Sequence, residues 1–110
     1  MTNGILIADD SEVFRRAVRS YLTLREFEIC GEAIDGALVI LDLRMPKMNG
    51  VEVASVLKGR MPDVRILLLT MYDEVLGYKS LMSAIGIDAM MAKTNCFKTL
   101  GGCVRGLLNN

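Results

Sequence analysis

Histidine and tryptophan are absent from this 110-residue sequence, and proline occurs only twice. The three cysteines are far apart and form no Cys-x-x-Cys pair. Because protein zinc sites are built from closely spaced cysteines and histidines, this composition excludes a zinc site of the usual kind. We interpret Cys30, Cys96 and Cys103 as small buried hydrophobic residues in a reducing compartment.

An excess of charge of either sign is also missing, because 13 basic residues balance 13 acidic residues. Nucleic acids and anionic membranes recruit proteins through clustered Lys and Arg, so we expect no direct binding to either. Apolar runs such as residues 66–69 are far too short to cross a bilayer. The first ten residues lack the basic segment of a secretory signal, and we therefore expect a cytoplasmic protein.

Short apolar runs alternate with segments of helical periodicity along the chain. This alternation predicts βα units around a parallel sheet, and the length fits a single domain, 1–110. The predicted strands cover residues 5–8, 27–33, 38–41, 64–69 and 87–92, and the predicted helices begin near Ser11, Asn49, Asp73 and Thr94 or Asn95.

The first predicted helix is amphipathic and follows Ser11, a residue that favours helix N-termini. Its apolar residues recur at helical spacing, which predicts one buried face. These residues are Phe14, Val18, Tyr21 and Leu22. We expect its arginines to face water, namely Arg15, Arg16, Arg19 and Arg25.

Polar residues stand at the carboxyl ends of four predicted strands: Asp9 and Asp10, then Asp42, Thr70 and Lys93. In an open parallel sheet these ends converge, so the residues predict one site. Three neighbouring carboxylates repel one another unless a cation lies among them, and Mg²⁺ prefers such oxygen ligands. A lysine and a hydroxyl group beside them suit phosphoryl transfer onto an aspartate. Taken singly, each residue has an ordinary alternative as a helix cap, a strand-end hydroxyl or a surface lysine.

Four segments resemble the receiver domain of bacterial two-component response regulators. They are Ala8-Asp9-Asp10, the run from Asp42 to Gly50 with Pro46 four residues after its aspartate, Leu68-Leu69-Thr70, and Ala92-Lys93-Thr94. The resemblance implies an α/β flavodoxin-like fold, doubly wound, with five parallel strands in the order 2-1-3-4-5.

The resemblance also implies a phosphorylation-dependent signalling switch. Asp42 would accept a phosphoryl group from a sensor histidine kinase or a small phosphodonor, with Thr70 and Lys93 as the other catalytic residues. Mg²⁺ would be ligated by Asp10, Asp42 and the backbone carbonyl of Arg44, and by Asp9 through water. Phosphorylation would change the surface formed by the fourth helix, fifth strand and fifth helix, which signals to a downstream effector domain or protein. A homodimer is a further possibility that the family offers.

Two methionines depart from the family's pattern. Met90 occupies the position of the usual switch aromatic, and Met71 follows Thr70 where the family usually has a small residue. We expect Met71 to restrict access to the phosphoryl group and to slow self-dephosphorylation. A pseudo-receiver, with the same fold but acting only as a protein-interaction or dimerisation module, therefore stays an alternative, and whether the chain is an enzyme stays open. An aspartyl-phosphate phosphatase of another α/β family fits less well, because Asp9-Asp10-Ser11 lacks its acid spacing.

The link between the second and third predicted strands is unusually short. The four steps from Ile34 to Leu38 span at most about 14 Å, whereas a crossover must return along a strand of about 17 Å and sideways by roughly 10 Å. The family has its second helix here, and parallel crossovers normally need a dozen or more residues. We expect that the sequence as given omits this helix although the molecule contains it. The alternatives are a genuine deletion of the helix and a domain swap hinged at Asp35-Gly36. A tight Asp-Gly hairpin is a further alternative, but it would pull Asp9 away from Asp42.

Overall fold

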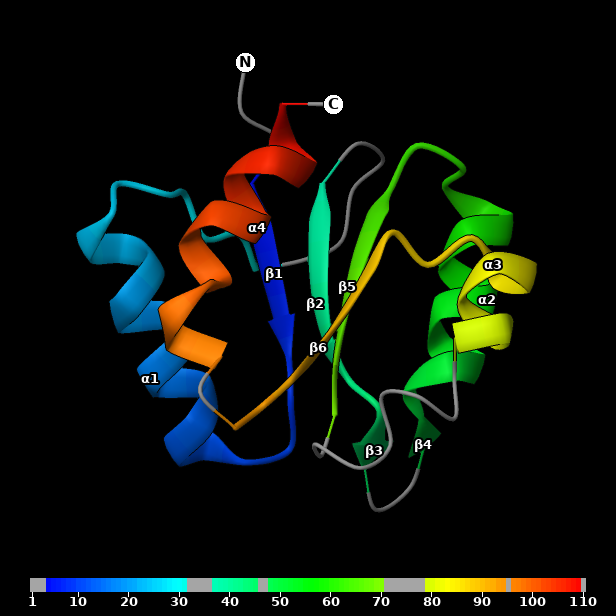
Figure 1. Cartoon of the computed structure of the whole chain (residues 1–110), viewed down its shortest axis with the longest axis horizontal. Helices are drawn as coiled ribbons and strands as arrows, with labels where there is room; N and C mark the ends of the chain where they lie inside the picture. Colours follow the sequence, from blue (N-terminus) through cyan, green and yellow to red (C-terminus); the bar gives the residue numbers. More distant parts are fainter. Residues whose placement is uncertain (1–3, 32–36, 46–47, 71–78, 95, 110) are drawn as a thin grey trace.

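The computed structural model describes residues 4–31, 37–45, 48–70, 79–94 and 96–109 (Figure 1). Its main sheet contains four parallel strands in the order β1-β2-β5-β6. Their bounds are β1 Ile5–Ala8, β2 Leu38–Asp42, β5 Arg65–Thr70 and β6 Ala89–Ala92. The predicted parallel α/β arrangement is therefore confirmed, with strand ends that differ from the prediction by two residues or fewer in these four strands.

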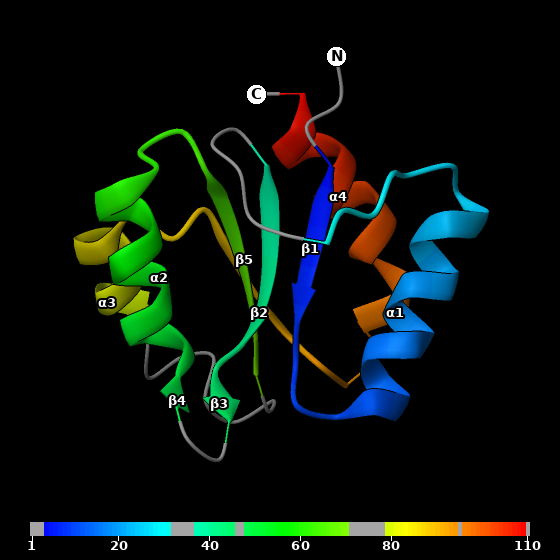
Figure 2. The same ribbon diagram turned by 180° about the vertical axis from the view of Figure 1, so that it is seen from behind.

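Helices cover both faces of this sheet (Figures 1 and 2). On one face lie α1 (Glu12–Leu24) and α4 (Leu100–Leu108), and on the other lie α2 (Gly50–Arg60) and α3 (Lys79–Ile85). Side chains of successive residues in β2 alternate between two buried clusters, with Leu38 and Ile40 in one and Val39 and Leu41 in the other. A strand that is apolar on successive residues is typical of a sheet buried on both sides.

Residues at the helix ends fix where the helices begin and stop. Ser11 caps α1 by accepting a hydrogen bond from the backbone N–H of Phe14, as predicted. Asn49 caps α2 in the same way through the N–H of Val51 at 2.7 Å. Gly86 ends α3 in the left-handed region, at a φ of 89°, which a glycine adopts without a steric cost. The start of this helix, predicted at Asp73, lies outside the described residues.

In the described part of the predicted second strand, residues 27–31, the sheet pairing is a single parallel bridge between Ile29 and Ile5. The N–H of Ile5 donates to the carbonyl of Glu28, and its carbonyl accepts from the N–H of Cys30. Ile5 also pairs with Leu38 on its other side. The order of the five segments is thus the predicted 2-1-3-4-5. In the described residues the first segment pairs through one residue, Ile29, which lies beside the first residue of β1.

This register explains how a short link suffices. Ile29 and Leu38 are level along the sheet, because both pair with Ile5. The connection therefore needs to cross only two strand spacings, roughly 10 Å, and nine residue steps reach about 30 Å. The difficulty with a short link applies only to a second strand that extends over residues 27–33. A hairpin between the two segments is excluded because β1 lies between them. The Asp35-Gly36 junction itself lies outside the described residues.

Two local features differ from the sequence prediction. The last helix is preceded by a separate 3-10 turn, η3 (Cys96–Lys98), and α4 begins after Thr99 rather than near residue 94. The N–H of Thr99 bonds to the carbonyl of Cys96 three residues earlier, which is the tighter 3-10 pattern. A small antiparallel pair, β3 (Arg44–Met45) and β4 (Met48–Asn49), was not predicted.

The described cysteines form no disulfide bond with one another. Cys96 is buried, whereas Cys30 and Cys103 are half-buried. Burial raises the pKa of the Cys96 and Cys103 thiols, so both favour the protonated form. Neither length nor hydropathy allows any helix in the described part of the chain to cross a membrane.

Candidate functional site

The predicted polar residues meet at the carboxyl ends of the strands, at the lower end of the sheet in Figure 1. Asp9 follows β1, Asp42 is the last residue of β2, Thr70 is the last residue of β5, and Lys93 follows β6. Because the strands are parallel and in register, their ends lie at one edge. The sequence reasoning placed these four residues correctly.

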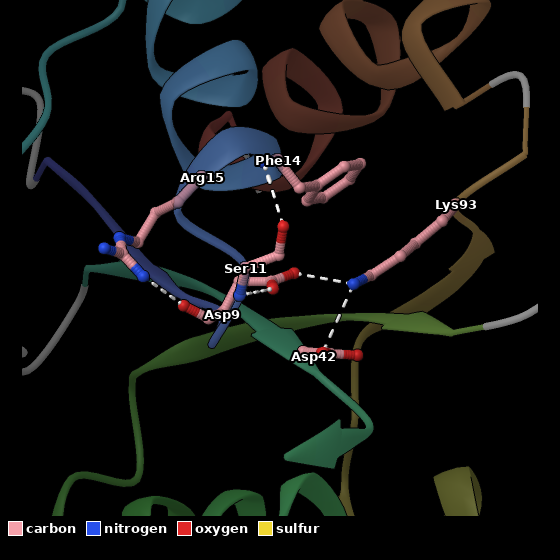
Figure 3. Close-up of polar contacts among 6 residues, drawn as sticks. All are labelled: Asp9, Ser11, Phe14, Arg15, Asp42 and Lys93. Atoms are coloured by element: carbon pink, nitrogen blue, oxygen red, sulfur yellow. Dashed lines mark hydrogen bonds and ion pairs between the residues drawn. The ribbon is translucent and has the colours of Figure 1, made fainter. Parts of the chain in front are cut away.

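Lys93 lies between two carboxylates (Figure 3). Its Nζ is 2.8 Å from Asp9 Oδ2 and 3.2 Å from Asp42 Oδ2. The side chain of Lys93 is 21% exposed, whereas those of Asp9 and Asp42 are 3% and 8% exposed. These ion pairs are therefore shielded from bulk water. Electrostatic attraction between such shielded charges is stronger than between exposed charges.

The charge of Lys93 is stabilised by its two partners. Burial lowers the pKa of the Lys93 ammonium group, but hydrogen bonds and charge attraction from Asp9 and Asp42 raise it by more, so the net shift is upward. Lys93 is thus a fixed positive charge at neutral pH.

A third carboxylate, that of Asp10, lies beside the pair. Ligand oxygens of Asp9, Asp10 and Asp42 are all within 4.8 Å of one another. Asp9 Oδ2 is buried, and the Lys93 ammonium group is the described group that contacts it, at 2.8 Å. Three carboxylates against one lysine leave an excess of negative charge, and clustered oxygen donors are what a hard divalent cation prefers. The residues therefore fit Mg²⁺.

Thr70 and Arg44 are the remaining predicted site residues. Thr70 is 2% exposed, and its backbone carbonyl accepts a 2.7 Å hydrogen bond from the N–H of Lys93, so the two residues are tied together. Arg44 begins β3, two residues after Asp42. The ligand role of its carbonyl stays a prediction.

Backbone contacts hold the loop after β1, and sequence reasoning missed one of them. The N–H of Ser11 donates to Asp9 Oδ1 at 2.8 Å, which fixes this carboxylate against the start of α1. Arg15 was expected to face water, but it is half-buried and its guanidinium donates to the backbone carbonyl of Asp9 at 2.5 Å (Figure 3). The only sign of this contact in the sequence is that Arg15 lies one helical turn after the capping residue Ser11.

One glycine, Gly50, and one aromatic residue, Phe14, also shape the site. A Cβ on Gly50 would lie 2.3 Å from the backbone oxygen of Asp42, so the start of α2 packs directly against the phosphoacceptor candidate. The ring of Phe14, which the sequence assigned only to the core, lies under Lys93, with 4.6 Å between Nζ and the ring centroid.

One of the two unusual methionines, Met90, lies among the described residues. Met90 is half-buried and packs against the apolar cluster under α2 and α3. The side chain of Met90, at the position of the family's switch aromatic, thus lies inward in this structure. Met71 lies outside the described residues, and its expected effect on dephosphorylation stays a prediction.

A family model for the response regulator receiver domain matches residues 5–102. The chain belongs to this family. The receiver domain is 31% identical over 118 positions to the response regulator protein VraR of Staphylococcus aureus, in an alignment covering 96% of this chain and 56% of VraR. The chain spans about half the length of the curated relatives it matches.

Solved structures resemble the receiver domain along nearly all of its length. The response regulator TrrA of Thermotoga maritima, solved in complex with Mg²⁺-BeF, is 29% identical with a TM-score of 0.78, covering 97% of this chain and 99% of TrrA. A CheY-like receiver protein from Methanospirillum hungatei has a TM-score of 0.85 at 20% identity, covering 99% of this chain and 95% of its own. The flavodoxin-like α/β fold is thereby confirmed.

Proposed function

We propose that this receiver domain is a signalling switch that accepts a phosphoryl group on Asp42. The observation that carries the proposal is the position of Lys93, whose ammonium group contacts both Asp42 and Asp9 at the point where three carboxylates converge. A lysine held there can neutralise an incoming phosphoryl group and keep the acceptor carboxylate in place.

The residues of the chain divide the reaction among them. An Asp42 carboxylate oxygen attacks the phosphorus atom of the donor and forms an acyl phosphate O–P bond. The donor's P–N or P–O bond breaks at the same time, and the leaving group departs with the bonding electron pair. Lys93 balances negative charge on the phosphoryl oxygens, and the hydroxyl of Thr70 donates a hydrogen bond to one of them.

Mg²⁺ is the cofactor that this proposal implies. Asp10, Asp42 and the carbonyl of Arg44 would hold it directly and Asp9 through water, and when bound it would neutralise charge on the phosphoryl oxygens. The compact cluster of three carboxylates, two of which share Lys93, supports this assignment.

The partners follow from the family. We infer that a sensor histidine kinase supplies the phosphoryl group and that an effector domain or protein reads the surface of α3, β6 and α4. We further infer that residues 1–110 form one receiver domain, and a cytoplasmic location stays a prediction. A homodimer is one form that the output could take.

Incubation with a small phosphodonor and MgCl₂, followed by intact mass spectrometry, tests the proposal. We expect one added phosphoryl group on the wild-type domain, none on Asp42→Asn, and none when EDTA replaces MgCl₂. Asp63→Asn is the matched control, because it removes an exposed carboxylate that lies outside the cluster. A wild-type domain that gains no mass, although folded, would instead support the pseudo-receiver alternative.

A further inference from the structure

We propose that Phe14 is a positioning residue for Lys93, and this inference rests on the proposed phosphorylation of Asp42. Nζ of Lys93 lies over the face of the Phe14 ring, 4.6 Å from its centroid, while also contacting Asp9 and Asp42 (Figure 3). The negative face of an aromatic ring attracts an ammonium group, more strongly where water is excluded. Lys93 is therefore contacted by two carboxylates and one aromatic ring.

The position of the Phe14 ring is set from the start of α1. Phe14 is the third residue of this helix, and its backbone N–H is bonded to the capping hydroxyl of Ser11. The same loop carries Asp9, whose carboxylate accepts from the N–H of Ser11. One short segment thus presents both a carboxylate and an aromatic face to the same ammonium group.

Other rings keep Phe14 in place. Phe97 packs against it with 6.1 Å between ring centroids and a tilt of 44°, and Tyr21 packs against Phe97 at 5.1 Å. The hydroxyl oxygen of Tyr21 accepts a 3.1 Å hydrogen bond from the N–H of Gly101 in α4. These contacts link α1 to η3 and α4, so the ring under Lys93 rests on a packed aromatic cluster rather than on one side chain.

This arrangement has a consequence for phosphoryl transfer. The carboxylates attract Lys93, but a phosphoryl group on Asp42 would change the charge that they present. The ring of Phe14 is unaffected by that reaction and would keep the ammonium group near the new phosphoryl oxygens. Loss of the aromatic face should therefore weaken the interaction in the transition state more than it weakens binding of the donor.

The test uses Phe14→Leu, which removes the aromatic face but keeps an apolar side chain, and Phe14→Met as a second variant in case the first folds poorly. Phe14→Tyr keeps the ring. Phe27→Leu is the matched control, because the ring of Phe27 lies 5.3 Å from the guanidinium of Arg105, away from the site. Thermal unfolding establishes that each variant is folded.

The first readout is the NMR signal of the Lys93 ε-methylene protons in protein with ¹³C-labelled lysine, assigned by Lys93→Arg. We expect an upfield ring-current shift in the wild type, Phe14→Tyr and Phe27→Leu, and its loss in Phe14→Leu. This readout needs no phosphorylation, so it decides the position of Lys93 even if Asp42 accepts no phosphoryl group. An unshifted wild-type signal would overturn the proposal.

The second readout is the rate of phosphorylation at increasing donor concentration. We expect Phe14→Leu to lower the maximal rate about three- to tenfold, with little change in the donor concentration at half-maximal rate. Phe14→Tyr should stay within about twofold of the wild type, and Phe27→Leu should match it. A wild-type maximal rate in both Phe14→Leu and Phe14→Met would contradict a positioning role.

Discussion

Buried charge dominates the site at the scale of single residues. As whole residues, Asp9 and Asp42 are each 6% exposed, and an isolated buried carboxylate is costly. The cost is offset because Lys93 contacts both, and because the N–H of Ser11 donates to the other oxygen of Asp9.

Gly50 gives a sharp prediction at the same scale. Its missing side chain is required because a Cβ would meet backbone atoms of Asp42 and Leu43 at 2.3 Å and 2.9 Å, and backbone atoms cannot move aside cheaply. We expect Gly50→Ala to lower the free energy of unfolding by about 2 kcal/mol or more. Urea denaturation measures this change.

Gly59 in the same helix provides the control for that substitution. A Cβ at Gly59 would meet nothing within 4 Å, so Gly59→Ala should raise stability by about 0.5–1 kcal/mol through helix propensity. Equal effects of the two substitutions would show that propensity, and not close packing on Asp42, decides the outcome.

The sequence was sufficient to place Asp9, Asp42 and Lys93 because a strand end in a parallel sheet has only one possible edge. It was not sufficient for Phe14 and Arg15. Which side of α1 faces the site depends on how the helix docks on the sheet, and that angle is set by tertiary packing rather than by periodicity.

The edge segment is the element in which the structure differs most from the prediction. Among the described residues of this segment, 27–31, Ile29 is the one that pairs with β1, through two backbone hydrogen bonds of 2.8 Å and 2.9 Å, from the N–H of Ile5 and from that of Cys30. Sequence pattern alone predicted a full strand over residues 27–33. The length of the following link overrides the β propensity of these residues, because the chain must return to the level of Leu38.

Hydrogen exchange should report this weak attachment. We expect the amide of Cys30, bonded at the sheet edge, to exchange at least tenfold faster than those of Ile40 and Leu67, which lie in buried central strands. Measurement by NMR at several pH values separates local opening from global unfolding. Protection of Cys30 as strong as that of Ile40 would mean that the edge segment opens only with the whole sheet.

The short elements around the site were beyond the sequence for a related reason. The pair β3 and β4 contains only two residues in each strand, and η3 contains three. Periodicity cannot be recognised over so few residues. Both features nevertheless belong to the segments that follow Asp42 and Lys93, where irregular backbone delivers the functional groups.

At the scale of the whole molecule, two apolar clusters hold a sheet whose lower edge carries an unbalanced group of charges. Three carboxylates converge within 4.8 Å, with Lys93 as the lysine that contacts two of them. Repulsion within such a group opposes folding, whereas the apolar clusters favour it. The proposed metal site thus links ion binding to the stability of the entire domain.

Mg²⁺ should therefore stabilise the receiver domain against unfolding. At an ion concentration ten times the dissociation constant, binding to the folded state alone adds about 1.4 kcal/mol, which raises Tm by several degrees. We expect Asp10→Asn to abolish this increase, and to be more stable than the wild type without the ion because one repelling charge is removed. Thermal unfolding with and without MgCl₂, at matched ionic strength, provides the measurement.

Glu52→Gln is the control, because it removes an exposed carboxylate of α2 that lies outside the cluster, and its response to Mg²⁺ should equal that of the wild type. A response to Mg²⁺ that survives Asp10→Asn unchanged would place the ion elsewhere.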